Sequence, residues 1–268
     1  MSFEPISGKH AIVEAVFGVT LRRAFNSSEI EALVNSHDRW RGQVPKLSRQ
    51  TMMQVAVGEG IPPAFMQAPA GGVIFDRVKP DGTLAWRLSA LDQSLLVNCG
   101  DYTRWAEVFP TTLALMTDAA EVAAISSNPI TNLLLQYVDI FEWKDRNKSP
   151  RFDQILDLKS DWLPKNIGQS GHLWHVHQGW FRTEGLPMPG RLLERINFDG
   201  VMNQNNEPAL RIDSYLRLDL QNPIKSSDLF RKSQGREFFE FLHNSSKELI
   251  SKFLTKAAQD RIALNASN

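Results

Sequence analysis

One stretch decides the fold, residues 210–220, which read Leu210-Arg211-Ile212-Asp213-Ser214-Tyr215-Leu216-Arg217-Leu218-Asp219-Leu220. Apolar and polar side chains alternate along it almost without a break. Because successive side chains of a β-strand point to opposite faces of a sheet, this pattern predicts a strand with one face on the core and the other facing away from it. The polar face alternates in sign, arginine against aspartate.

The same two-residue period recurs along the chain and predicts further strands at residues 12–21, 47–57, 73–78, 84–90, 94–99, 130–143, 173–181 and 192–198. Helical spacing of apolar residues marks other segments. One helix begins with a capping box at Asn26 and Glu29, and a second follows Asp101 and contains Pro110, which is expected to kink or split it. A short helix is expected near residues 152–158 and a long one over residues 236–262.

Together these elements predict an α+β fold, in which helices back an antiparallel sheet and a long helix closes the C-terminus. We expect residues 1–268 to form a single α+β domain. The order strand, helix, several strands, helix occurs twice, which also indicates two structurally similar halves, 1–128 and 129–268. No residue-level repeat accompanies this order, and a simpler helix-on-sheet fold is the alternative.

Composition argues against several classes of protein. The 268 residues include 30 basic and 30 acidic side chains, so no global field attracts nucleic acid or an anionic membrane, and we expect neither as a partner. The only cysteine, Cys99, cannot form an internal disulfide and fits a reducing compartment, so we expect a cytoplasmic protein. No segment has the apolar length of a membrane span.

Phosphate-loop, dinucleotide-binding and nucleophile-elbow motifs are absent, so we expect no cofactor and favour a non-enzymatic function.

Residues 58–72 are rich in glycine and proline, which disfavours regular structure, and we expect a long loop there. Between its prolines this segment carries Phe65 and Met66. Apolar side chains in a loop either fold onto the core or contact a partner. Both alternatives stay open, and Phe65 and Met66 are candidate partner-binding residues.

The C-terminal strands carry a candidate recognition surface for a ligand or partner. Its members are polar or aromatic residues on one strand face: His175, His177, Arg195, Asn197, Arg211, Tyr215 and Arg217. Arginines at alternating strand positions suit an anionic or polar ligand. The alternative is a face in contact with water that cross-strand ion pairs hold together.

His175 and His177 project from the same side of their predicted strand, a spacing that lets two imidazoles share a metal ion. A third ligand is needed, and Asp199, Asp213 and Asp219 lie on later strands. A metal-dependent enzyme is therefore one alternative function.

A small-ligand binder is another alternative. Its pocket would lie between the sheet and the C-terminal helix and would be lined by Trp86, Trp174, Trp180 and Phe241. Packing in an ordinary core explains the same aromatic residues.

Four motifs suggest a family. They are Pro5-Ile6 followed by Ala11-Ile12-Val13-Glu14-Ala15-Val16-Phe17, then Tyr102-x-x-Trp105-x-x-x-Phe109, Leu135-Gln136-Tyr137-Val138-Asp139, and Leu242-His243 with Phe253. The chain resembles a sporadically distributed prokaryotic protein family of unknown function and about this length. In that family an arginine and an asparagine flank the tyrosine of the third motif, where this chain has Gln136 and Asp139. The resemblance implies an accessory or mobile gene, including phage-defence and toxin–antitoxin modules.

From these observations the sequence favours a non-enzymatic binding protein of an accessory system, with a protein as its partner. The polar sheet face and the Gly/Pro-rich segment would form the contacts, and a homo-oligomer is left open.

Overall fold

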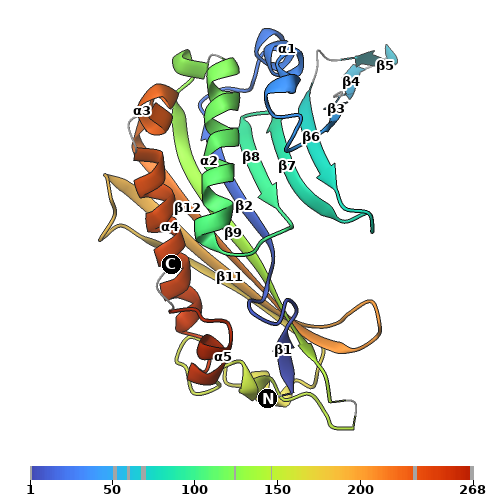
Figure 1. The fold of residues 1–268 in the computed structure, drawn as a ribbon, viewed down its shortest axis with the longest axis vertical. Helices are drawn as coiled ribbons and strands as arrows, with labels where there is room; N and C mark the ends of the chain where they lie inside the picture. Colours follow the sequence, from blue (N-terminus) through green and yellow to red (C-terminus); the bar gives the residue numbers. More distant parts are fainter. Residues whose placement is uncertain are drawn as a thin grey trace.

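An antiparallel sheet of ten strands is the frame of the molecule (Figure 1). The computed structural model describes residues 2–50, 53–58, 61–67, 71–123, 125–145, 147–231 and 234–265, with only the backbone for residues 53–58 and 61–67. The sheet strands are β1 Phe3–Pro5, β2 Ile12–Leu21, β3 Lys46–Gln50, β6 Gly72–Val78, β7 Leu84–Leu91, β8 Ser94–Cys99, β9 Ile130–Trp143, β10 Trp174–Arg182, β11 Gly190–Met202 and β12 Pro208–Ile224. The α+β class and the antiparallel sheet predicted from the sequence are confirmed.

The strand order is β10-β11-β12-β9-β2-β8-β7-β6-β3, and β1 pairs with β9 outside this path. The long strands β2 and β9 form the central pair, in which Phe17 lies opposite Leu135 and Val19 opposite Leu133. Both strands alternate between core-facing and outward residues, so the pairing register aligns their apolar sides. Strands β10, β11 and β12 form one wing of the sheet, and β8, β7, β6 and β3 form the other.

Helices cover one face of the sheet (Figure 1). They are α1 Ser27–Asn35, α2 Trp105–Val122, α3 Ser226–Arg231, α4 Gln234–Ser251 and α5 Lys256–Arg261. The Phe17 ring of the central strand meets Trp105 and Phe109 of α2 at centroid distances of 5.7 and 6.3 Å, and Phe239 of α4 at 6.0 Å. The buried core therefore lies between the helices and this face. We call the opposite side, on which none of the described helices lies, the open face.

Local signals fix the start of α1 as expected, but the expected split of α2 at Pro110 does not occur. Asn26 accepts a hydrogen bond from the Glu29 backbone N–H, and the Glu29 side chain accepts one from the Asn26 backbone N–H, which completes the predicted capping box of α1. Pro110 does not split the second helix, because α2 runs from Trp105 to Val122 without a break. Its buried stripe, which includes Phe109 and Met116, keeps the helix against the sheet.

The predicted loop over residues 58–72 is wrong, since β4 Met53–Gly58 and β5 Ile61–Gln67 pair as an antiparallel hairpin. The same pairing replaces the single strand predicted at residues 47–57. A two-stranded hairpin has only edge strands, where proline is tolerated because the missing N–H need not bond to a neighbour. Phe65 and Met66 lie in β5, and their side chains are outside the described part of the structure.

The long C-terminal helix predicted over residues 236–262 is also interrupted. Helix α4 ends at Ser251, and α5 begins after Thr255, whose hydroxyl accepts a hydrogen bond from the Ala258 N–H and donates one to the Gln154 carbonyl. Buried Phe253 and Leu254 occupy the break. Packing of this connecting turn therefore ends α4, although the helical spacing of apolar residues continues beyond it. The periodicity of the sequence did not reveal this stop.

The remaining elements are 3₁₀ turns, η1 His37–Arg39, η2 Ile125–Ser127, η3 Phe152–Gln154 and η4 Ile167–Gln169. Turns η3 and η4 stand between β9 and β10, where a short helix was predicted. None of the helices in the described residues is long and apolar enough to cross a membrane.

Candidate functional site

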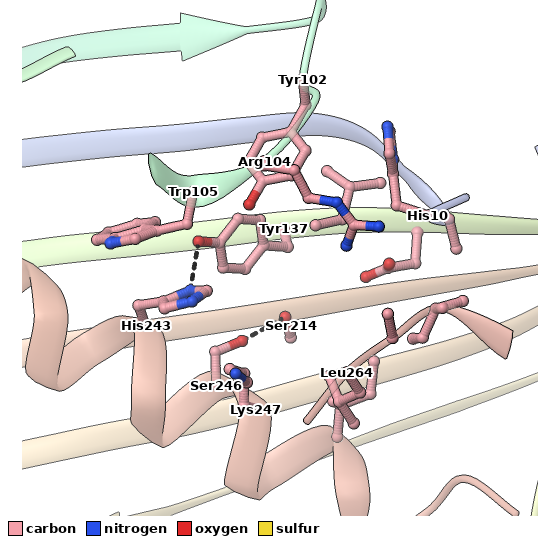
Figure 2. Close-up of a pocket in the computed structure, with 16 residues that line it drawn as sticks. His10, Tyr102, Arg104, Trp105, Tyr137, Ser214, His243, Ser246, Lys247 and Leu264 are labelled. Carbon is pink, nitrogen blue, oxygen red and sulfur yellow. Dashed lines mark hydrogen bonds between the residues drawn. The ribbon is translucent and has the colours of Figure 1, made fainter. Parts of the chain in front are cut away.

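A cavity of about 80 Å³ lies between the helix-covered side of the sheet and the C-terminal helices (Figure 2). Strands β2, β9 and β12, the start of α2, and helix α4 with the turn after α5 supply its walls. We call it the Asp139 pocket. Its lining residues are His10, Ala11, Ile12, Tyr102, Arg104, Trp105, Tyr137, Asp139, Ser214, His243, Ser246, Lys247, Ile250, Ile262, Ala263 and Leu264.

Asp139 is the most unusual residue of this pocket. It lies on β9 between Ile12 of β2 and Ile212 of β12, and only 5% of its surface is exposed. With the residues that the structure describes, its carboxyl forms neither a hydrogen bond nor an ion pair. Burial, and secondarily the charge of nearby Asp213, raises the pKa of Asp139 to about 7. Because this carboxyl lines the pocket and has no protein partner among the described residues, Asp139 is a candidate functional residue.

Lys247 is a second charged group of the pocket without a partner. It projects from α4, and its ammonium forms no hydrogen bond or ion pair with any described residue. Lys247 is partly buried, and this burial lowers the pKa of its ammonium. The exposed Arg104 adds positive charge, with one guanidinium nitrogen 3.4 Å from the Lys9 carbonyl oxygen. The pocket therefore has an acid and a base that face the same cavity and do not pair with each other.

Tyr137 and His243 form a fixed polar pair beside Asp139. A hydrogen bond of 3.0 Å, drawn as a dashed line in Figure 2, joins the Tyr137 hydroxyl and His243 Nδ1, and the His243 ring stacks on Trp105 at a centroid distance of 4.2 Å. Burial, with a smaller effect of Lys247, lowers the pKa of His243 to about 4, so the imidazole is neutral near pH 7. A neutral imidazole nitrogen can accept the Tyr137 proton, which fixes the orientation of both rings.

Two more rings close the upper side of the pocket. Tyr102 meets Tyr137 edge-on at a centroid distance of 5.8 Å, and His10 meets Tyr102 edge-on at 5.6 Å. Burial raises the pKa of Tyr102, so its phenol stays protonated and can donate a hydrogen bond. Burial, and then the charge of Arg104, lowers the pKa of His10. These aromatic faces suit a cationic group, whose attraction to a ring grows when water is excluded.

The floor of the pocket is polar as well. Ser214 of β12 and Ser246 of α4 have hydroxyl oxygens 3.3 Å apart, and both side chains are buried. Each hydroxyl can both donate and accept, so this pair can turn toward a bound group. The arrangement can thus hold a small polar molecule by its charges and by hydrogen bonds.

The residues predicted as a recognition surface lie together on the open face. Opposite one another across the strands are His175 and Asp199, His177 and Asn197, and Arg195 and Tyr215. The Arg195 guanidinium lies 4.4 Å from the centre of the Tyr215 ring. These strand partners could be inferred only after the register was known.

Ion pairs hold much of that surface. Arg217 bonds Asp219 at 2.7 Å, and Arg211 lies 3.4 Å from Asp213 and 3.6 Å from Asp199. The alternative of a face in contact with water and held by ion pairs is therefore supported for these arginines. Two buried atoms of this face, Arg195 Nε and Asn197 Oδ1, have no hydrogen-bond partner among the described residues.

Two other sites were predicted from the sequence, a metal site at His175 and His177 and a pocket lined by aromatic residues. The described residues contain no group of three or more histidine, cysteine, aspartate or glutamate side chains placed to hold a metal ion, so His175 and His177 have no third ligand there. The pocket predicted between sheet and C-terminal helix exists in that location, but its predicted lining is wrong. Trp86 is a core residue, and Trp174, Trp180 and Phe241 pack against the core away from the Asp139 pocket.

Comparisons with known proteins give no family for this chain, since neither the family models nor the curated proteins include a match. The resemblance to a sporadically distributed prokaryotic family stays a prediction. The candidate site accordingly depends on its own geometry.

Proposed function

We propose that the chain binds a small zwitterion, a molecule with a protonated amine and an acidic group, in the Asp139 pocket. The observation that carries this proposal is the buried Asp139 carboxyl, which has no partner among the described residues. A ligand ammonium would supply both the opposite charge and the hydrogen bonds that this carboxyl lacks. The proposal keeps the small-ligand alternative predicted from the sequence and replaces its lining residues.

The cations that line the pocket indicate that the second charged group of the ligand is acidic. Lys247 and Arg104 are the cations that line the pocket, and Lys247 has no acidic partner among the described residues. An acidic group on the ligand would pair with Lys247 while its amine pairs with Asp139. The cavity of about 80 Å³ has room for the part of a small ligand that carries these two charged groups, about the size of a small amino acid.

Binding of this kind requires an ionised Asp139. Because its pKa is about 7, the ionised fraction rises from roughly one tenth at pH 6 to roughly nine tenths at pH 8. The affinity for an amine ligand is therefore expected to rise about tenfold over this range. Protons released on binding would appear in calorimetry as a dependence of the enthalpy on the buffer.

The test is isothermal titration with three probes of similar size: alanine, propionate and ethylamine. We expect alanine to bind most tightly, because it alone has both charged groups. Asp139→Asn should weaken alanine binding at least tenfold and leave propionate binding unaffected. Lys247→Met should also weaken alanine binding, but it should leave ethylamine binding unaffected. Asp161→Asn, which changes an exposed carboxylate in a loop, is the matched control. If none of the three probes binds, or if Asp139→Asn binds alanine as well as the unaltered chain does, the proposal is wrong.

Partner binding by an accessory, defence or toxin–antitoxin-like protein is a second proposal. It is supported by the helix-free surface around Arg195 and Asn197, whose buried Nε and Oδ1 atoms lack partners among the described residues. Co-expression with the products of neighbouring genes tests it, with Arg195→Ala as the variant. A complex that survives this substitution unchanged would argue against use of this surface.

The two similar halves are also retained as a proposal. The order of the strands supports it, since β2-β8-β7-β6 on one side of the centre corresponds to β9-β12-β11-β10 on the other, each followed by a long helix, α2 or α4. Superposition of residues 12–122 on residues 130–251 tests it. A match that requires shifted strand order would contradict a duplication.

A further inference from the structure

The two edges of the sheet differ in how they are protected. Strand β3 is five residues long and carries the charged Lys46 and Arg49, and Arg49 pairs with Glu31 of α1. Strand β10 is nine residues long, pairs only with β11 among the described residues, and has no proline, lysine or acidic residue; its one arginine, Arg182, stands at its end and pairs with Glu194 of β11. Natural edge strands usually carry such features because they prevent pairing with another chain. Strand β10 is therefore the unprotected edge.

Exposed apolar residues gather at this same edge. Leu173, which directly precedes β10, is 61% exposed, Phe181 near its end is 53% exposed, and Trp162 of the adjoining loop is 44% exposed. The Trp162 ring packs against Trp180 of β10 at a tilted angle, with a centroid distance of 4.9 Å. Of the five large hydrophobic residues exposed in the described part of the chain, three thus lie in or beside β10. Such clustering marks an interaction surface.

Strand β10 is complementary to itself. In an antiparallel pair of two copies with His177 on the two-fold axis, Leu173 lies opposite Phe181 and Trp174 opposite Trp180, each pair twice. His175 then lies opposite Gly179, which leaves room for its ring. No acidic residue and no pair of permanent like charges occurs in this register, so nothing in the strand opposes it.

We infer that β10 pairs antiparallel with β10 of a second copy, which joins two sheets across a two-fold axis. The occupant is a second copy because this register covers both exposed apolar residues with each other, as an isologous interface requires. The inference does not depend on the Asp139 pocket, which lies on the covered face near the middle of the sheet.

Cysteine crosslinking tests the axis directly. Residues directly opposite in an antiparallel pair have Cα atoms about 4.5–5.5 Å apart, within disulfide range. His177→Cys should therefore crosslink to its own copy under mild oxidation with copper phenanthroline. In the matched variant His175→Cys, the thiols of the two copies are offset by four residues along the strand direction, roughly 13 Å. This variant should therefore crosslink at least tenfold more slowly. The native Cys99 is buried in β8 and serves as an internal background.

Light scattering after size exclusion provides the independent measurement. The unaltered chain should have twice the mass of one chain, and Phe181→Asp should raise the dimer dissociation constant at least tenfold. Val78→Asp, at a residue 47% exposed on a distant strand, should leave it unchanged. A monomeric unaltered chain at about 50 µM, or equal crosslinking of both cysteine variants, would overturn the inference.

Discussion

Substitution of Asp139 by asparagine tests the energetics of the pocket without any ligand. On folding, the carboxyl pKa rises from 3.8 to about 7, mainly because of burial. Between these two values the folded chain holds a proton that the unfolded chain has already released. Stability therefore falls as the pH rises through this window, in total by about 4 kcal/mol at 1.36 kcal/mol per pKa unit.

Asparagine keeps the shape of the side chain and cannot ionise, so the variant lacks this loss. Relative to the unaltered chain, it should gain about 2 kcal/mol of unfolding free energy between roughly pH 5.5 and roughly pH 8.5. Any cost of the new buried amide, about 1–3 kcal/mol, is the same at both pH values and cancels in the difference.

Urea denaturation followed by tryptophan fluorescence measures both proteins at each pH. The control is Asp161→Asn, an exposed carboxylate whose removal should shift the two measurements equally. If the stability difference between Asp139→Asn and the unaltered chain stays constant across this pH range, the carboxyl is not protonated on folding and the reasoning about the pocket fails.

Two further predictions concern packing around the pocket. Tyr137→Phe removes the hydroxyl that lies 3.0 Å from His243 Nδ1 and should lower the unfolding free energy by about 1–2 kcal/mol, measured by urea denaturation; an unchanged midpoint would mean that the hydrogen bond contributes nothing. Phe239→Ala empties the contact of α4 with the sheet and should cost about 3–5 kcal/mol, whereas Phe241→Ala, at a partly buried position of the same helix, should cost clearly less; equal losses would contradict the core assignment.

The fold was predictable where local patterns and tertiary packing agree. Alternation along residues 210–220 placed Leu216 in the core and Arg217 on the open face, because a sheet with helices on one side imposes that same period. The capping box of Asn26 and Glu29 likewise fixed the start of α1.

Elements whose ends depend on long-range contacts were not predicted correctly from the sequence. Thr255 is a local signal for the start of α5, but the break before it depends on packing of Phe253 and Leu254 against distant residues, which the sequence pattern does not show. The β4–β5 hairpin was missed because a proline rule for central strands was applied to strands that are both edges.

The candidate site was missed for a similar reason. Tyr137 and His243 are 106 positions apart, and only the packing of α4 on β9 brings them together. One local signal existed: Asp139 ends the run Leu135-Gln136-Tyr137-Val138-Asp139 inside a strand of mostly apolar residues. An acidic residue inside such a strand must be paired or protonated. The strand is long and mostly apolar, which indicates a central strand, so the burial of Asp139 could have been inferred.

Asp139 and Asp213 occupy adjacent strands but point to opposite sides of the sheet, and the second contributes to the proton affinity of the first. The charge of Asp213, which is itself nearly buried beside Arg211, is thus felt across the thickness of the sheet. An additional cation bound on the open face near Asp213 would favour release of the proton from Asp139 and so strengthen amine binding on the far side. By thermodynamic reciprocity, an occupied interior would in turn make the outer surface more attractive to that cation.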